Sequence, residues 1–222
     1  MFWIDSNAFF RLTMLEETVA NLEKCLYTTS LPSATSHRCV VVFDRSHAVT
    51  YRHGTAHTLL QKDQVVNLYN VSDSRFMIEV VVIAIAEKYD FVVFKTTKKQ
   101  FPDFPHASHE MYRGQKYVQL GVDHKRGVFW KDGIISVKRV GFYLGTSHGQ
   151  PGDSGAGIFD DAGHFLGISV AAKTFAFPNL EMMKIDDIAN HHPSTKIVNW
   201  DVILAFAGIV DSDDDFKPPE TD

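Results

Sequence analysis

The chain is poor in cysteine, because its 222 residues include only Cys25 and Cys39. Two thiols cannot form the several disulfides that hold small secreted domains together, so a disulfide scaffold is excluded. A single Cys25–Cys39 bridge is the one pairing that the composition leaves open. A domain of this size buries about 70% of the surface that its unfolded chain exposes, and therefore needs no covalent cross-link.

Long apolar runs and a surplus of basic residues are also absent. No segment approaches the roughly 20 consecutive apolar residues of a membrane-spanning helix. The first fifteen residues lack the basic start and apolar run of a signal peptide. The net charge of -5 argues against a dedicated nucleic-acid-binding protein. We therefore expect a cytoplasmic monomer, as such or released from a longer precursor, that binds neither membranes nor nucleic acids.

The eleven histidines follow no metal-binding spacing. Neither His-Glu-x-x-His nor Cys-x-x-Cys occurs, and the densest histidine segments are His106–His109 and His191-His192. Because these motifs place ligands on one side of one element, their absence gives no reason to expect a metal site or a cofactor.

Short β-rich runs dominate the chain from Cys39 onward, with a linker at residues 97–114 between two groups of them. Lys131-Asp132-Gly133 is typical of a hairpin turn. Regular short strands of this kind predict a barrel or a sandwich rather than alternating strands and helices, and two antiparallel barrels joined by the linker are the expected architecture. The expected strands are Cys39–Phe43, His47–Arg52, Val65–Tyr69, Phe76–Ala86, Phe91–Lys95, Lys116–Gly121, Gly127–Trp130, Ile134–Leu144, Gly157–Phe159, Phe165–Ala172 and Thr195–Trp200.

Helices are expected only near the two ends. Apolar residues at helical spacing predict a helix over Thr13–Leu26, with Thr13 and Glu16 as a capping box. A second helix is expected over Asp201–Ile209, with Asp201 as its N-cap. The expected organisation is a lead-in at 1–36, a first barrel at 37–96, a linker at 97–114, a second barrel at 115–210 with an irregular loop at 175–194, and a disordered acidic tail at 211–222.

The segment Gly149–Gly157 is unusually rich in glycine. Composition alone favours a flexible turn, but a serine hydroxyl needs a base and preset oxyanion donors to attack a carbonyl. Glycine at Gly152 allows its own N–H and that of Ser154 to point into one concavity. The run from Gly152 to Gly155 reads Gly-Asp-Ser-Gly and resembles the nucleophile signature of the trypsin-like serine peptidases. The resemblance implies Ser154 as nucleophile and Gly152 and Ser154 as the oxyanion hole.

Two further runs resemble the same family. Ala48–His53 resembles its strand that ends in a catalytic histidine, although Tyr51 and Arg52 replace two small residues. Asp90–Lys95 resembles the strand that begins with its catalytic aspartate. The order of His53, Asp90 and Ser154 along the chain is the family's order, and the resemblance implies that His53 is the general base and that Asp90 orients it. His57 is the competing histidine, and Asp63 and Asp73 are the competing carboxylates.

The compact gaps and the N-terminal helix are similar to those of the serine main proteases of positive-strand RNA viruses. This resemblance implies an all-β fold of two antiparallel six-stranded barrels and a serine endopeptidase that acts on a protein or peptide substrate, such as a polyprotein. His148 stands where trypsin has its specificity aspartate, so trypsin-like specificity is not expected. His148 with Thr146 or Ser147, and Ser169, would suit a glutamate or glutamine side chain. The strand over 167–172, including Val170 and Ala171, is expected to pair with the substrate backbone.

Two other functions remain open. An α/β-hydrolase esterase would use Ser154, Asp187 and His192 in that chain order, but this fold needs helices between its strands. A binding module could carry the same barrels and residues without an assembled catalytic site.

Overall fold

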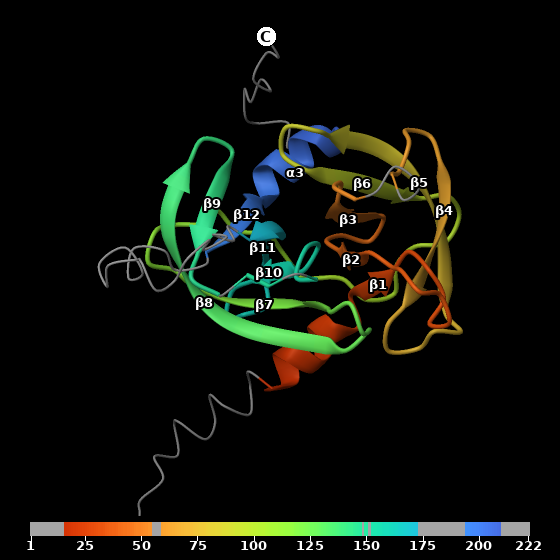
Figure 1. The fold of residues 1–222 in the computed structure, drawn as a ribbon, viewed down its shortest axis with the longest axis horizontal. Coiled ribbons are helices and arrows are strands. Elements are labelled where there is room, and N and C mark those ends of the chain that lie inside the picture. Colours follow the sequence, from red (N-terminus) through yellow and green to blue (C-terminus); the bar gives the residue numbers. More distant parts are fainter. Residues whose placement is uncertain (1–15, 55–58, 148, 151, 173–193, 210–222) are drawn as a thin grey trace, which may run out of the picture.

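A computed structural model describes residues 16–54, 59–147, 149–150, 152–172 and 194–209. Two β-barrels lie side by side, the first drawn in red to yellow and the second in green to blue (Figure 1). The expected all-β fold of two closed, antiparallel, six-stranded barrels is confirmed. Within the described ranges, no helix combines the length and the apolarity needed to cross a membrane.

The two barrels share one topology. The first closes in the order β1-β2-β3-β6-β5-β4 and the second in the order β10-β11-β12-β9-β8-β7, which is the same path through six strands. The first consists of β1 (Leu26–Thr28), β2 (Cys39–Val42), β3 (His47–Tyr51), β4 (Val65–Asn70), β5 (Met77–Ala86) and β6 (Phe91–Thr96). The second consists of β7 (Lys116–Val122), β8 (Val128–Arg139), β9 (Phe142–Gly145), β10 (Gly157–Phe159), β11 (Phe165–Ala172) and β12 (Thr195–Asn199).

The predicted hairpin turn at Lys131-Asp132-Gly133 is wrong. These residues lie within the long strand β8, where Gly133 pairs with Tyr117 of β7. A Cβ atom at residue 133 would lie 2.4 Å from Cζ of Tyr117, so the glycine makes room for an aromatic ring and does not turn the chain. The turn instead lies at Val140 and Gly141, where Gly141 has a φ of 77°.

Both predicted helices form with shifted ends. Of the first, the described part covers residues 16–23, and Leu26 begins β1 instead of ending the helix; Thr13 lies outside the described residues. Helix α3 is Trp200–Ala207, and its N-cap is Asn199 rather than Asp201. Asp201 lies in the first turn, where its carboxylate accepts a 2.9 Å hydrogen bond from Asn199 Nδ2 and faces the positive end of the helix dipole. Of the predicted loop at 175–194, only Ser194 belongs to the described residues. The predicted tail at 211–222 lies outside them.

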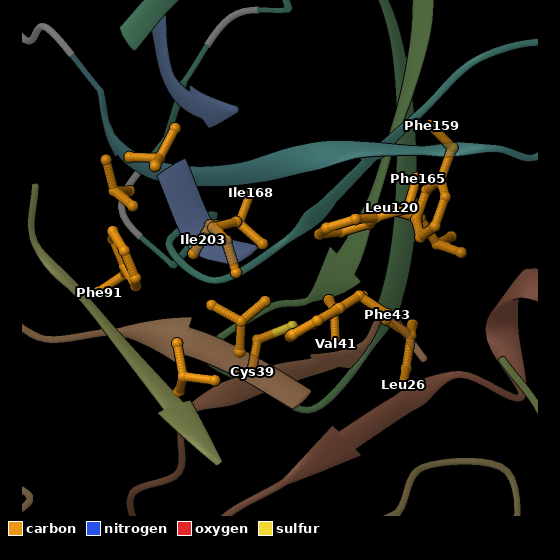
Figure 2. Packing of buried hydrophobic residues seen from close by; sticks show 14 of the residues in the cluster. Leu26, Cys39, Val41, Phe43, Phe91, Leu120, Phe159, Phe165, Ile168 and Ile203 are labelled. Carbon is orange, nitrogen blue, oxygen red and sulfur yellow. The ribbon is translucent and has the colours of Figure 1, made fainter. Parts of the chain in front are cut away.

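Three apolar cores hold the structure together. One fills the first barrel, a second fills the second barrel, and the third joins the two. This joining core contains Cys39 and Val41 of β2 and the following Phe43, together with Leu120 of β7 and Ile168 of β11 (Figure 2). The barrels are therefore packed on one another through a buried apolar layer.

Helix α3 spans the junction between the barrels. It contacts β5 and β6 of the first barrel and β11 and β12 of the second. Its buried residues Val202 and Ile203 belong to the joining core, as does Phe91 at the start of β6. The helix thus fixes one barrel against the other.

Candidate active site

His53 and Asp90 lie side by side because β3 and β6 are paired. Tyr51 pairs with Phe91, so the chain leaving β3 meets the chain entering β6. Asp90 Oδ2 lies 2.6 Å from His53 Nδ1, and Asp90 Oδ1 accepts the backbone N–H of His53 at 2.7 Å. A carboxylate only accepts hydrogen bonds, so Nδ1 carries the proton and Nε2 is left as a base. Asp90 has a φ of 66°, a region that aspartate tolerates better than most residues.

Arg38 binds the backbone that carries the histidine, a role that the sequence did not indicate. Its buried guanidinium donates to the carbonyl oxygens of Tyr51 at 3.0 Å and of His53 at 2.8 Å. The guanidinium carbon lies 4.7 Å from the centre of the Tyr51 ring, and that ring lies 4.5 Å from the His53 ring. Tyr51, which departs from the family's small residue, thus links Arg38 to the histidine. Burial lowers the pKa of Arg38 from its ordinary value.

A buried ion pair of Asp153 with Lys131 fixes the loop before β10, which carries Ser154. The Asp153 carboxylate is buried and accepts from Lys131 Nζ of β8 at 2.6 Å and from the backbone N–H of Gln150 at 2.7 Å. Gly155 donates its N–H to Ser169 of β11 at 2.7 Å. Its φ of 87° and its distance to the Cys39 carbonyl, which a Cβ would approach to 2.4 Å, require glycine. Lys131 is a further residue that the sequence did not indicate.

The backbone donors of this loop divide into two groups. The N–H groups of Asp153, Gly155 and Ala156 each donate to a backbone carbonyl. Within the described part of the chain, those of Gly152 and Ser154 have no hydrogen-bond acceptor. They are the pair that the sequence predicted as an oxyanion hole, and their positions leave both donors available to a ligand.

One cavity of about 540 Å³ brings the expected residues of both barrels together. Its lining includes His53 from the first barrel and Gly152 and Ser154 from the second. The Ser154 hydroxyl donates a long hydrogen bond of 3.4 Å to the carbonyl oxygen of Val170 in β11. The structure thus places His53 and Ser154 at one cleft, with Asp90 hydrogen-bonded to His53, while their catalytic roles stay predictions. His57 lies outside the described residues.

All but one of the expected specificity residues lie within the described structure. His148 lies outside the described residues, whereas Ser147 and Ser169 are buried. Val170 and Ala171 are part of β11, where Ala171 pairs with Lys196 of β12.

Ser147 belongs to a buried polar cluster that the sequence did not predict. Its Oγ lies 2.6 Å from the Tyr117 hydroxyl and donates to Gln119 Oε1 at 2.6 Å, while Thr195 Oγ1 lies 3.0 Å away. Burial raises the pKa of Tyr117 above its ordinary value. Tyr117 and Gln119 come from β7, Thr195 from β12 and Ser147 from the segment after β9, so the closed barrel is what brings them together.

Comparison with known proteins relates the chain to others by structure and not by sequence. No protein-family model and no curated protein matches the sequence. Among solved structures, a serine endoprotease from Yersinia pestis superposes with a TM-score of 0.63 at 13% identity over 89% of this chain and 67% of that one. Rv3671c from M. tuberculosis H37Rv, in the inactive form of a serine-to-alanine mutant, superposes with a TM-score of 0.59 at 15% identity over 90% and 93%. At these identities the likeness shows the fold alone, which is chymotrypsin-like.

Proposed function

We propose that this chain, with its chymotrypsin-like fold, is a serine endopeptidase. The observation that carries the proposal is the meeting, in one cavity, of an aspartate-anchored histidine and a serine whose loop leaves two backbone donors free. Each part is needed for acyl transfer, and they come from different barrels. An α/β-hydrolase is excluded by the all-β topology, and Asp187 and His192 lie outside the described residues.

The mechanism follows from these positions. His53 Nε2 takes the Ser154 proton as Oγ attacks the scissile carbonyl, and Asp90 stabilises the imidazolium through Nδ1–H. The N–H groups of Gly152 and Ser154 bind the oxyanion of the tetrahedral intermediate. The imidazolium then protonates the leaving amine, and water, deprotonated by His53, hydrolyses the acyl-enzyme. The Ser154 hydroxyl must leave the Val170 carbonyl to begin this sequence.

The substrate is a protein or peptide in extended form. Ser169 of β11 exchanges backbone hydrogen bonds with Gly155 and Ala156 of the nucleophile loop, and β10 begins only at Gly157, so it does not pair with β11 beyond this point. The backbone of Val170 and Ala171 can therefore pair with a substrate strand. His148, with Thr146 and Ser169, would favour glutamate or glutamine next to the cleaved bond. A polyprotein is the substrate class that the compact viral serine proteases suggest.

Labelling with a fluorophosphonate probe tests the nucleophile directly. The parent chain should become labelled, and Ser154→Ala should not. Asp90→Asn should keep the fold but reduce kcat by about 10⁴-fold, because the histidine loses its correct tautomer. Absence of labelling in a folded parent chain would instead indicate a binding module on the same barrels.

Cleavage of a peptide library tests the pocket. Preferred cleavage after glutamate or glutamine should weaken when His148 is replaced by alanine. Cleavage after arginine or large aromatic residues would remove the specificity proposal while leaving the endopeptidase itself intact.

A further inference from the structure

A second group of chemically active side chains lies away from the active-site cleft. His109 belongs to the segment between the barrels, whereas Asp160 and His164 flank the turn from β10 to β11. One ligand atom from each of the three lies within 4.8 Å of the others. The rings of His109 and His164 meet edge to face with centres 4.3 Å apart, and His164 Nδ1 lies 2.8 Å from Asp160 Oδ2.

Backbone pairing holds this group in place. Ser108 forms an isolated parallel bridge with Phe165, the first residue of β11. The His109 N–H donates to the Phe165 carbonyl at 3.3 Å, and the Phe165 N–H donates to the Ala107 carbonyl at 2.9 Å. Residues that are far apart in sequence are thereby brought together by main-chain bonds, independently of any attraction between their side chains.

We propose that His109, Asp160 and His164 bind a divalent transition-metal ion of the zinc class. Two imidazoles and one carboxylate form a ligand set that zinc takes readily, with water as the fourth ligand. Zinc bonds of about 2.0–2.1 Å at tetrahedral angles place the ligand atoms about 3.3 Å apart. The present spacing needs only a small closure, and His109 is exposed and can supply it by rotation.

The charges around the group favour a cation. The cavity beside it measures about 450 Å³ and is lined by three carboxylates and only one lysine, in addition to the two histidines. The charged and titratable lining residues besides Tyr112 are His109, Glu110, Lys116, Asp160, Asp161 and His164. Asp161 lies next to Asp160 and could replace the water as fourth ligand.

The competing explanation is a turn closed by hydrogen bonds alone. Asp160 Oδ1 accepts the N–H groups of Ala162 at 3.0 Å and of His164 at 2.8 Å, which is an ordinary role for an aspartate in a turn. That explanation accounts for Asp160 and for the His164 backbone. It gives no role to the imidazole of His109, which comes from another segment and lies edge to face on the His164 ring.

The position of the group indicates a structural and not a catalytic ion. Ser154 precedes β10, and Asp160 follows it, so the cluster and the nucleophile lie at opposite ends of that strand. An ion there would tie the segment between the barrels to the second barrel. Binding to the folded chain alone then stabilises it by mass action.

Thermal unfolding of the full chain tests the proposal, in a Ser154→Ala background that prevents self-cleavage. Zinc at about 100 times its dissociation constant should raise the Tm by about 5–10 °C relative to EDTA. His109→Gln and His164→Gln should each abolish that gain. His106→Gln is the matched control, because His106 is an exposed histidine of the same segment outside the cluster, and it should keep the gain.

Cobalt provides a second measurement that does not depend on stability. In the Ser154→Ala background, Co²⁺ should give the intense visible absorption of a tetrahedral site both without a further change and with His106→Gln. The absorption should be absent with His109→Gln. The proposal fails if zinc leaves the parent Tm unchanged, or if His109→Gln and His164→Gln gain as much as the parent. Loss of the gain in His106→Gln as well would also refute this set of ligands. None of these outcomes bears on the peptidase proposal, since Ser154 is absent throughout.

Discussion

Replacing Lys131 with methionine is expected to loosen the loop that carries Ser154. The change removes the ammonium that lies 2.6 Å from the buried Asp153 carboxylate and keeps most of the apolar stem. Asp153 would then retain the Gln150 N–H and lose a charged donor. The loop would relax to bring the carboxylate to water, and the N–H groups of the proposed oxyanion hole would move with it.

The magnitude follows from the burial of the pair. Breaking a fully buried ion pair from one side costs about 3–5 kcal/mol. The side chains of Lys131 and Asp153 are 24% and 8% exposed, so water screens the pair in part and we expect about 2–3 kcal/mol. If this cost falls on loop formation, kcat/KM decreases by about 30- to 150-fold. If it falls on the whole fold, the Tm decreases by about 4–12 °C.

Two assays separate these outcomes. The kcat/KM for peptide hydrolysis reports on the loop that carries Ser154. The Tm in the Ser154→Ala background reports on the stability of the whole fold. Lys138→Met is the matched control on the same strand, because the Lys138–Glu110 pair is exposed and 3.4 Å long, and it should change neither value appreciably. The reasoning is wrong if Lys131→Met keeps the parent kcat/KM and the parent Tm together.

Three further predictions concern other parts of the chain. Gly155→Ala should lower the Tm clearly more than Gly114→Ala, since both glycines have a φ of 87° but only at Gly155 would the Cβ clash with a backbone carbonyl; equal Tm losses would contradict the steric argument. Burial raises the pKa of Cys25 and Cys39 to about 12 from 9.0, so the unfolded chain releases their protons first and the free energy of unfolding should fall as pH rises from about 9 to 12. Urea titrations of the parent and of a double cysteine-to-alanine variant check this, and an unchanged pH slope in that variant would refute it. Arg38→Met should lower kcat more than it raises KM, because the arginine holds the backbone carbonyl of His53, the proposed general base; a change in KM alone would exclude this positioning role.

Most strands were predictable because β-branched and aromatic residues in short runs favour pleated, half-buried structure. Phe165–Ala172 and Gly157–Phe159 match the predicted bounds, and most other strands differ by one residue at an end. The predicted strands Gly127–Trp130 and Ile134–Leu144 are wrong, since the chain forms β8 and β9 with the turn between them at Val140 and Gly141, and β1 was not predicted. The failures have a common cause. Gly133 was interpreted as a local turn signal, although the Tyr117 ring explains it, and Leu26 was assigned to the helix, although it pairs with Val41. Tertiary contacts decide both positions.

The residues of the candidate site also fall into those that the sequence predicts and those that only tertiary contacts bring together. His53, Asp90 and Ser154 were predicted because each lies in a run of neighbours that carries information by itself. Lys131 is a member of a strand with no motif, and it meets Asp153 only through the barrel. The three proposed metal ligands form no motif in the sequence for a similar reason. They meet only once the segment between the barrels has paired with β11. Sequence spacing therefore finds sites built within one run and misses those built between runs.

The position of α3 in the chain has a consequence for the order of events during synthesis. The ribosome completes both barrels before it makes Trp200–Ala207, and domains fold in that order as they emerge. The histidine and the serine come from different barrels, and the helix that contacts both is made after them. We therefore expect the proposed active site to assemble only after α3 has left the exit tunnel, so that peptidase activity would begin after both barrels and this helix are complete.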